Sequence, residues 1–277
     1  MDFEHVLLTR FNVRLSDDQE SPCEEWLAAR IRIFRDLCLP SVRRQRRPPQ
    51  HWFVFCDART PRRWQSEIER LAAGGAFRPV WLDGAFDARA VNEAVAAEGL
   101  GRRKYLVSSR LDCDDALAPH FTETVQQQLG RTSGAYFVNL VLGYQMSAGR
   151  FYLRPYIANP FISYVEPQFP GRPWATVFCR PHHMITDQPL VQVRCRPAWL
   201  QVIHGRNLTN RVRGIRTGDR MPTRLFDVPE HYLTGSDSTA AQVADQISSG
   251  VRFVTDSLRD GTTRSRLRNV IRHRLTG

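Results

Sequence analysis

Residues 110–115 read Arg-Leu-Asp-Cys-Asp-Asp and follow directly on the apolar run from Tyr105 to Ser109, so three carboxylates lie within four residues at the end of a predicted strand. Carboxylates this close raise one another's pKa unless a positive charge offsets them, and a divalent ion with oxygen ligands is the usual partner. On an extended chain Asp112 and Asp114 point to one side and Asp115 to the other. The stretch predicts a cation site at the carboxyl edge of a sheet, where open α/β sheets bind their ligands.

A helix N-cap is the alternative interpretation of the same acids. Asp114 or Asp115 could cap a helix from Leu117 to Leu129, because the apolar residues of that segment recur at helical spacing.

The chain before the acidic stretch alternates between strand and helix patterns. The predicted strands are 6–11, 51–56, 79–82 and 105–109, and the predicted helices begin at a capping-box pattern at 21–24, at 60–61 and at 87. Repeated units of this length predict a mainly parallel sheet with right-handed crossovers and helices on both faces.

After residue 130 the rhythm changes to extended segments at 135–146, 151–156, 161–166, 175–179 and 199–203, the first two joined by a hairpin signal. We therefore expect an α/β fold with a mixed or antiparallel second half. Residues 1–210 are expected to form one domain, divided into a nucleotide-sugar half (1–118) and an acceptor half (119–210). Residues 211–277 are expected to form a helical, basic extension packed on it.

Composition excludes several classes of protein. The 277 residues are 42% hydrophobic, contain no apolar run long enough to span a membrane and begin with an acidic segment unlike a signal peptide, so we expect a cytoplasmic protein. The six cysteines show no C-x-x-C pair, which favours reduced thiols over zinc or disulfides.

The net charge of +11 is weak evidence for a nucleic-acid partner, and none is expected. Lys104 is the only lysine among 39 basic residues, a bias that the nucleotide composition of a gene can produce. The arginine-rich tail from Arg264 to Arg274 surrounds an apolar stripe. That stripe either lies on an anionic membrane, at its cytoplasmic face, or packs on the domain.

Five segments together resemble the rhamnosyltransferase group of glycosyltransferases: residues 5–12, 57–61, 109–117, 159–166 and 204–207. Their order and spacing match over most of residues 3–210, and the R-L-D-x-D-D motif is complete. The resemblance implies a GT-A-type fold, a nucleoside diphosphate sugar as donor, a bound divalent cation (Mn²⁺ or Mg²⁺) as cofactor, and rhamnose as the transferred sugar. The acceptor would be a glycan, a lipid-linked compound or a small molecule.

The resemblance also implies roles for individual residues. Asp114 would bind the metal, Asp112 would contact ribose or the metal through water, and Asp115 would orient the donor sugar. His204 would complete the metal site, although a histidine hydrogen-bonded at a strand end explains it equally well. The other residues expected to bind the donor are Thr9, Arg10, Asn12, Asp57 and Arg110. Either arginine would bind a phosphate group or serve as a structural ion-pair partner.

An inverting transfer needs a base for the acceptor hydroxyl. Glu166, at the end of an apolar strand, is the first candidate and Asp187 the second. Of His182 and His183, at most one is expected to face the site.

Two other classes of function remain open on the sequence. A metal-dependent phosphohydrolase or nucleotidyltransferase would also use clustered acids, although the chain has no glycine-rich phosphate loop. A basic nucleic-acid-binding module is the second alternative.

Overall fold

The computed structural model describes residues 2–100, 103–169, 172–185, 188–204, 211–218, 220–233 and 238–259. The strands are β1 (Phe3–Arg10), β2 (His51–Asp57), β3 (Arg78–Leu82), β4 (Tyr105–Asp112), β5 (Ala116–Leu117), β6 (Tyr136–Leu140), β7 (Leu142–Ser147), β8 (Arg150–Pro155), β9 (Ile162–Pro167), β10 (Leu190–Val193), β11 (Trp199–Ile203) and β12 (Ile215–Arg216). The α-helices are α1 (Glu24–Ile33), α2 (Leu39–Arg43), α3 (Arg62–Ala72), α4 (Ala88–Ala97), α5 (Phe121–Gln126), α6 (Arg220–Phe226) and α7 (Thr239–Arg259). A π-helical turn, η1 (Phe34–Cys38), joins α1 to α2, and the 3-10 turns are η2 (Val177–Cys179), η3 (His182–Met184) and η4 (Glu230–Tyr232).

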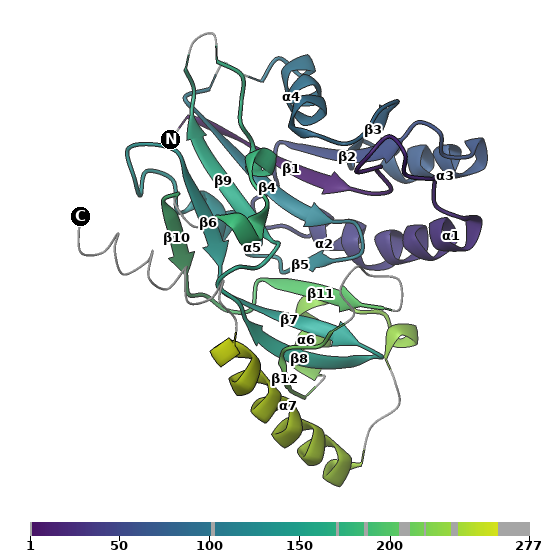
Figure 1. Ribbon diagram of the computed structural model, residues 1–277, viewed down its shortest axis with the longest axis vertical. Coiled ribbons are helices and arrows are strands. Elements are labelled where there is room, and N and C mark those ends of the chain that lie inside the picture. Colours follow the sequence, from purple (N-terminus) through teal and green to yellow (C-terminus); the bar gives the residue numbers. More distant parts are fainter. Residues whose placement is uncertain are drawn as a thin grey trace.

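The larger sheet has seven strands in the order β10-β6-β9-β4-β1-β2-β3 (Figure 1). β3, β2, β1 and β4 are parallel, whereas β9 runs antiparallel to β4 and β6. The chain proceeds outward from β1 to β2 and β3 and then returns to place β4 on the other side of β1. The order therefore reverses between β1 and β4, and such a switch point leaves a crevice at the carboxyl ends of the two strands.

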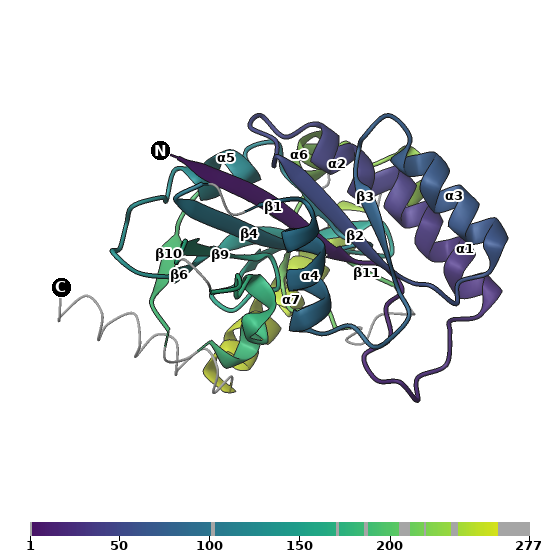
Figure 2. The ribbon, with the colours of Figure 1, turned by 90° about the horizontal axis from the view of Figure 1, so that it is seen from above.

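Helices cover both faces of this sheet because the residues of β1 alternate between two cores. Leu7 belongs to the core that contains Ile31 of α1 and Ile68 of α3, whereas Leu8 belongs to the core that contains Val91 of α4. Figure 2 shows α1 and α3 on one side of the sheet and α4 on the other.

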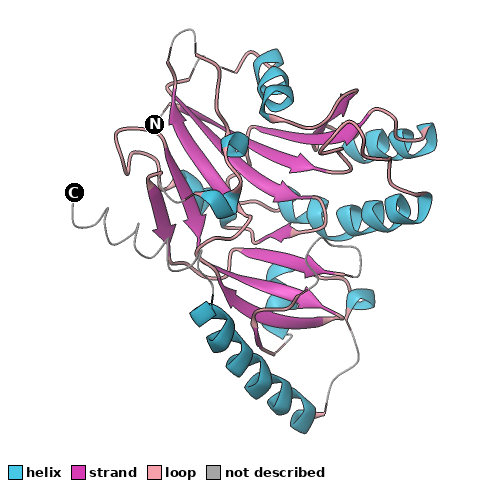
Figure 3. Ribbon diagram, viewed as in Figure 1, coloured by secondary structure: helices cyan, strands magenta, loops and turns pink. Residues whose placement is uncertain are grey.

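The smaller sheet has five strands in the order β12-β8-β7-β11-β5 and lies below the larger one in Figure 3. Its hydrophobic core includes Tyr144 of β7 and Leu200 of β11, together with Phe226 and Val228 from the chain after β12. The strand β12 pairs antiparallel with β8. The division of the chain into domains at residue 210 stays a prediction.

The architecture confirms the α/β class expected from the sequence, with a parallel first half and a mixed second half. The first four strands lie where the pattern predicts them, and Asp87 caps α4 by accepting from Ala90 N at 2.8 Å. The hairpin between β7 and β8 turns at Ala148 and Gly149, both with positive φ.

The helix predicted from Leu117 to Leu129 is much shorter than its periodicity indicates. Ala116 and Leu117 form β5 and pair with β11, so α5 begins only at Phe121. The prediction of a capping box at Ser21 is also wrong. The helix α1 begins at Glu24 without a side-chain cap, and Ser21 Oγ donates instead to Asp57 Oδ2 at 3.1 Å.

Two extended segments differ from the prediction for tertiary reasons. Residues 135–146 form two strands, because β6 joins the larger sheet and β7 the smaller one, with Val141 between them. Residues 175–179 form a loop and η2 rather than a strand, since Ala175 N and Thr176 N donate to the carboxylate of Glu166.

No helix within the described ranges is long and apolar enough to cross a membrane. All six cysteines are free thiols, as the sequence predicts.

Gly143 of β7 faces the indole ring of Trp199, which is 1% exposed and stacks on Phe161 with ring centroids 4.9 Å apart. A Cβ atom at position 143 would overlap that ring. We expect Gly143→Ala to lower the free energy of unfolding by about 1–3 kcal/mol, as overpacking of a core does. Gly84→Ala is the matched control, because a Cβ there meets no atom within 4 Å. Denaturant titration of both variants measures the difference; equal stabilities would contradict this packing.

A buried polar chain centres on His5 of β1. His5 Nε2 lies 2.8 Å from Ser109 Oγ, which is 2.6 Å from Ser163 Oγ, and Gln126 Nε2 donates to His5 Nδ1 at 3.1 Å. Burial lowers the pKa of His5 from 6.5 to about 3. The imidazole therefore stays neutral in the folded protein where it would be protonated in the unfolded chain.

Stability should consequently fall as pH drops from about 6.5 towards about 3, because the unfolded chain binds a proton that folded His5 does not. Between pH 7.5 and pH 5 this single group should remove about 2 kcal/mol. His5→Asn should be less stable at pH 7.5 but should lose less on acidification. Unfolding free energies of both proteins at the two pH values check this, and equal losses would show that His5 is not the group responsible.

Candidate functional site

Arg10, Arg110 and Asp112 meet at the switch point of the larger sheet. Arg10 ends β1 and Asp112 ends β4, and parallel pairing makes them register partners. Arg110 donates to Asp112 through Nη2 (2.7 Å to Oδ2) and Nε (3.3 Å to Oδ1), while Arg10 Nη2 donates to Oδ1 at 3.3 Å. The Asp112 side chain keeps 27% of its surface exposed. Two guanidinium groups therefore converge on one carboxylate in a position that solvent reaches.

Aromatic rings and a histidine support the two guanidinium groups. Arg10 and Arg110 lie 5.7 and 6.0 Å from the centroid of Phe178 in η2. Arg110 Nη1 lies 3.2 Å from His182 Nδ1, and because a guanidinium can only donate, His182 accepts at Nδ1 and presents Nε2–H. His182 is thus brought to the site. Residues 182–184 form η3 rather than the extended strand on which the expectation for the two histidines rested, and the side chain of His183 lies outside the described structure.

The charge on Asp112 is secured by these arginines. Burial alone would raise its pKa, but the guanidinium groups of Arg110 and Arg10 hold the pKa of Asp112 far below its usual range. Asp112 therefore remains ionised at neutral pH and keeps both arginines oriented.

Asp114 lies beside a different cation, Arg30 of α1. Arg30 Nη1 pairs with Asp114 Oδ2, and His204 Nε2 lies 3.0 Å from the same oxygen. Arg30 and Asp114 have side chains only 9% and 8% exposed, and the guanidinium also lies over the ring of Trp26 at 4.5 Å. The resemblance implies that His204 completes a site with Asp114, and the two side chains lie in contact although 90 residues separate them.

The strand alternation predicted for the three acids is wrong, because β4 ends at Asp112 and the chain turns there, with Asp115 N donating to Asp112 O at 3.1 Å. Asp112 and Asp114 consequently lie beside different arginines, and Asp115 has a third environment. Its Oδ1 accepts from Val202 N of β11 at 2.9 Å, and the side chain is buried. Burial, followed by the negative charges of Asp114 and Asp112, raises the pKa of Asp115 well above its usual range. The carboxyl therefore links the end of β4 in the larger sheet to β11 in the smaller one. Neither Asp114 nor Asp115 caps a helix, since α5 begins at Phe121 after His120, so the N-cap interpretation is wrong.

The donors present do not fit a divalent ion in this arrangement. His204 must carry a proton on Nε2 to donate to Asp114, and a nitrogen that carries a proton cannot bind a metal. The guanidinium of Arg30 pairs with the same carboxylate oxygen. Across the described ranges no group of three or more His, Cys, Asp and Glu side chains is placed to hold a metal. The cation that the acidic stretch requires is supplied here by arginine.

Three residues expected at the donor have structural partners instead. Thr9 is fully buried and accepts from Trp52 Nε1 at 2.9 Å. Asn12 Nδ2 donates to Thr60 Oγ1 at 2.8 Å, and Asp57, 1% exposed, pairs with Arg14 Nε at 3.3 Å. These contacts anchor the loops that follow β1 and β2.

Glu166 lies at the other end of the sheet from the acidic motif. It is the register partner of Leu106, six residues before Asp112 on β4, which corresponds to about 20 Å along a strand. Its carboxylate accepts from Ala175 N and Thr176 N, both at 2.9 Å, and burial raises its pKa. The structure therefore does not bring Glu166 to the site, and the other candidate base, Asp187, lies outside the described residues.

Arg30 was not predicted from the sequence, although it supplies the positive charge that pairs with Asp114 of the acidic motif. A signal was available: Arg30 lies between Leu27 and Ile31 on the face of α1 predicted to be buried, where an arginine requires an acidic partner. The partner could not be assigned because Asp114 is 84 residues away and the approach of α1 to β4 is a tertiary contact.

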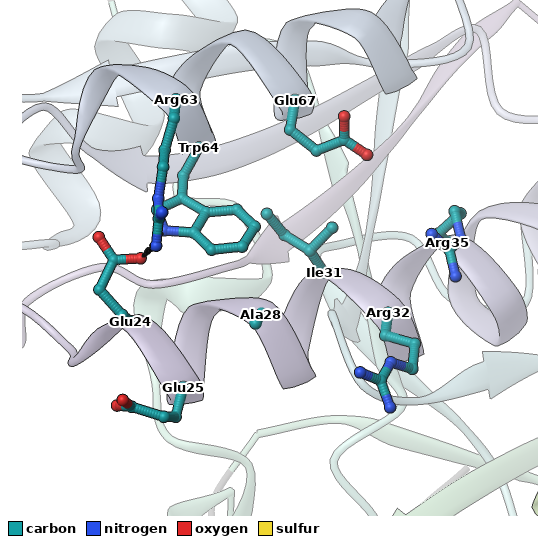
Figure 4. A pocket seen from close by; sticks show the side chains of 9 residues that line it. All are labelled: Glu24, Glu25, Ala28, Ile31, Arg32, Arg35, Arg63, Trp64 and Glu67. Atoms are coloured by element: carbon teal, nitrogen blue, oxygen red, sulfur yellow. Dashed lines mark hydrogen bonds and ion pairs between the residues drawn. The ribbon is translucent and has the colours of Figure 1, made fainter.

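A separate groove of about 620 Å³ lies between α1 and α3 (Figure 4). Trp64 Nε1 donates to Glu24 Oε2 at 2.5 Å across it, and Arg63 pairs with the same glutamate. None of the residues predicted for donor, metal or base lines this groove. It lies on the side of α1 that Arg30 does not occupy.

Removing Arg30 should leave a buried, uncompensated carboxylate. We expect Arg30→Met to cost about 3 kcal/mol of unfolding free energy, and Asp114→Asn in the same chain to restore part of that loss. The control cycle uses the exposed pair Arg89 and Glu93, for which little or no coupling is expected. Urea titrations of the single and double variants measure both couplings; additive effects at Arg30 and Asp114 would contradict the buried pair.

Comparisons with known proteins bear on the family. No curated protein matches the chain in sequence. Among solved structures, residues 1–349 of Staphylococcus aureus TarS with UDP-GlcNAc share 11% identity, with 94% of this chain and 75% of that chain covered and a TM-score of 0.43. HddC from Yersinia pseudotuberculosis shares 8% identity, with 73% and 93% covered and a TM-score of 0.34. The model of a family described as "Putative rhamnosyl transferase" matches residues 21–216, more than half of the chain, and the protein belongs to that family.

Proposed function

We propose that this protein is a glycosyltransferase that moves a sugar from a nucleoside diphosphate donor to a hydroxyl acceptor, with the donor diphosphate at the carboxyl ends of β1 and β4. Membership of the family supports a transferase of this class. The observation that carries the proposal is the convergence of Arg10 and Arg110 on Asp112 at the switch point of the sheet.

The local charge favours an anionic ligand. Two guanidinium groups surround one ionised carboxylate, so the cluster keeps a net positive charge, and all three side chains retain some exposure. Guanidinium groups bind phosphate oxygens through paired N–H donors, and both arginines lie beside the ring of Phe178. A diphosphate entering from solvent would meet donors that are already oriented.

The same donors can assist the reaction. As the bond between the sugar and the diphosphate breaks, negative charge grows on the departing phosphate, and fixed donors that meet this charge lower the barrier. Arg10 and Arg110 would stabilise the leaving group, with Asp112 holding them in place. His182 Nε2–H would add a neutral donor beside them.

Metal dependence is a separate prediction that the resemblance implies. Mn²⁺ or Mg²⁺ at Asp114, His204 and Asp112 would compete with Arg30 for the carboxylate of Asp114 and would require His204 to lose its Nε2 proton. We derive no step through such an ion. Donor binding with and without metal decides whether the arginines are sufficient.

Several finer features remain predictions from sequence. They are rhamnose as the transferred sugar, an inverting displacement, a base at Asp187, a cytoplasmic location, and contact of the tail from Arg264 to Arg274 with an anionic membrane. Asp187 and the tail lie outside the described residues. The acceptor is a glycan, a lipid-linked compound or a small molecule with a free hydroxyl group.

The alternative classes have less support from the geometry. A metal-dependent phosphohydrolase or nucleotidyltransferase needs acids that are free to hold metal, whereas Asp112 and Asp114 pair with arginines. For a nucleic-acid-binding module, arginines should gather on one face; here Arg30 and Arg14 are buried ion-pair partners.

Thermal shift with UDP-, GDP- and dTDP-sugars tests the proposal directly. A cognate donor at 100 times its Kd should stabilise the protein by about 2.7 kcal/mol, which raises Tm by about 5 °C for a chain of this size. Each donor is measured with Mn²⁺ and with EDTA. If arginines alone hold the diphosphate, EDTA should leave the shift unchanged.

Arg110→Gln should abolish the shift, because it removes both the charge and the fork that meets phosphate. The control is Arg89→Gln, because Arg89 is an exposed arginine of α4 that pairs with the neighbouring Glu93 far from β1 and β4. Donor binding by Arg110→Gln at wild-type strength would place the diphosphate elsewhere. A donor that binds but is only hydrolysed, with no acceptor glycosylated, would favour the phosphohydrolase class.

A further inference from the structure

Glu166 of β9 is a buried residue whose carboxylate binds two successive backbone amides. Its surface is only 7% exposed, and its two oxygens accept from Ala175 N and Thr176 N, each at 2.9 Å. Hydrogen bonds to an ionised carboxylate are roughly twice as strong as those between neutral groups. Glu166 therefore anchors the start of residues 174–185, the segment that contains η2 and η3 and that we call the strap.

Thr176, at the anchored end of the strap, has a backbone conformation that its own side chain disfavours. Its φ is 54° and its ψ is 174°, a region that is essentially reserved for glycine. The side chain is branched at Cβ and fully buried, and its Oγ1 has no hydrogen-bond partner among the described residues. Such strain persists only where surrounding contacts impose it, and it is concentrated at active sites and ligand clamps. Because Thr176 N itself bonds to Glu166, loss of that bond would let the residue relax.

The strap runs along β4 towards the candidate site. It starts at the level of Leu106, which is the register partner of Glu166. Val177 N then donates to Ser108 Oγ at 2.8 Å, and η3 reaches Arg110. Residues 106, 108 and 110 alternate along one strand, so their side chains lie on the same face of the sheet. The strap therefore crosses this face from the anchor at Glu166 to the arginines at the switch point.

The far end of the strap supplies two groups to these arginines. Phe178 in η2 lies 5.7 Å from the guanidinium of Arg10 and 6.0 Å from that of Arg110. The same ring packs edge-to-face on Phe86, with centroids 5.0 Å apart. His182 in η3 accepts from Arg110 Nη1. Displacement of the strap would remove an aromatic neighbour from both arginines and a hydrogen-bond acceptor from one of them.

We propose that Glu166 is a positioning residue of the donor site, which holds the strap so that Phe178 and His182 keep Arg10 and Arg110 oriented for the diphosphate. The inference rests on the proposed function, because that function locates the diphosphate at these arginines. Glu166 acts through the strap from about 20 Å along the strand, so its role differs from that of a base. Oriented donors bind phosphate without first being ordered, and the apparent Kd rises as the ordered population falls.

The decisive variant is Glu166→Gln. It keeps the size of the side chain but turns one acceptor oxygen into an N–H donor, which cannot bind a backbone N–H. Ser108→Ala removes a different contact of the strap and leaves Glu166 in place, so it tests the same inference if Glu166→Gln fails to fold. The matched control is Val165→Ala. Val165 precedes Glu166 on β9 and is fully buried, but it faces the opposite core, to which no residue of the strap belongs.

Hydrogen exchange of the full chain, measured by mass spectrometry without ligand, reports on the anchor. In Glu166→Gln we expect the peptide that covers residues 174–184 to exchange about tenfold faster, which corresponds to the loss of one hydrogen bond to a charged group. The peptides of β1 and β2 should exchange at the wild-type rate. Val165→Ala should leave the exchange of the strap unchanged, because it touches only the other core.

Isothermal titration calorimetry with UDP, GDP and dTDP measures the consequence for binding. The probe is the nucleoside diphosphate that the wild-type protein binds most tightly. Because relaxation of Thr176 makes the open strap the major state in Glu166→Gln, the Kd of the probe should rise about tenfold when the ordered strap is populated about a tenth of the time. Ser108→Ala should raise the Kd by a smaller factor, and Val165→Ala should leave it at the wild-type value.

Three results with the variants would overturn the inference. Unchanged exchange of the strap in both Glu166→Gln and Ser108→Ala would show that these residues do not anchor it. Faster exchange with an unchanged Kd would show that the strap is no part of the donor site. Equal rises in Kd for Glu166→Gln and Val165→Ala would show a general loss of stability. A wild-type protein that binds none of the three probes would refute the proposed function itself, and the inference with it; no variant can mimic that result.

Discussion

Parallel pairing of β1 with β4 is the constraint on which the candidate site depends. It makes Arg10 and Asp112 register partners at the ends of their strands, and it places them where the strand order reverses. A shift of one residue in this register would turn the side chains to the opposite face and separate the arginine from the carboxylate. The backbone positions of the site are therefore set by the central sheet, although its chemistry is carried by long side chains.

The acidic motif divides its carboxylates among three environments. Asp112 remains ionised between two partly exposed arginines, Asp114 is paired with buried Arg30, and Asp115 is buried against a backbone N–H of β11. One short stretch thus orients two arginines at the switch point of the larger sheet, anchors α1 and joins the two sheets. Substitution of any of the three acids would change stability as well as ligand binding, so measurements of binding need measurements of unfolding beside them.

Polarity is also arranged unusually in α7. A helix normally directs its apolar side inward, but here the neighbouring strands β8 and β12 offer Tyr152 and Arg216, which attract the polar side. The apolar residues Val243, Ile247, Val251 and Val254 are left exposed as a consequence. Hydrophobic periodicity predicts that a helix exists; it does not decide which side meets the protein when buried polar groups compete for contact.

The sequence alone determined the alternation of strands and helices in the first half, the end of β4 at the acidic motif, and the family, because local patterning and a complete motif specify these features. It also indicated that the clustered acids need a cation. Only the tertiary structure placed arginines beside these acids, since the contact of Arg30 with Asp114 depends on how α1 packs against the end of β4. The same holds for Glu166, whose register opposite Leu106 separates it from the motif, and for residues 135–146, whose two strands join different sheets. Contacts between residues far apart in the chain are set by packing and register, which no local pattern encodes.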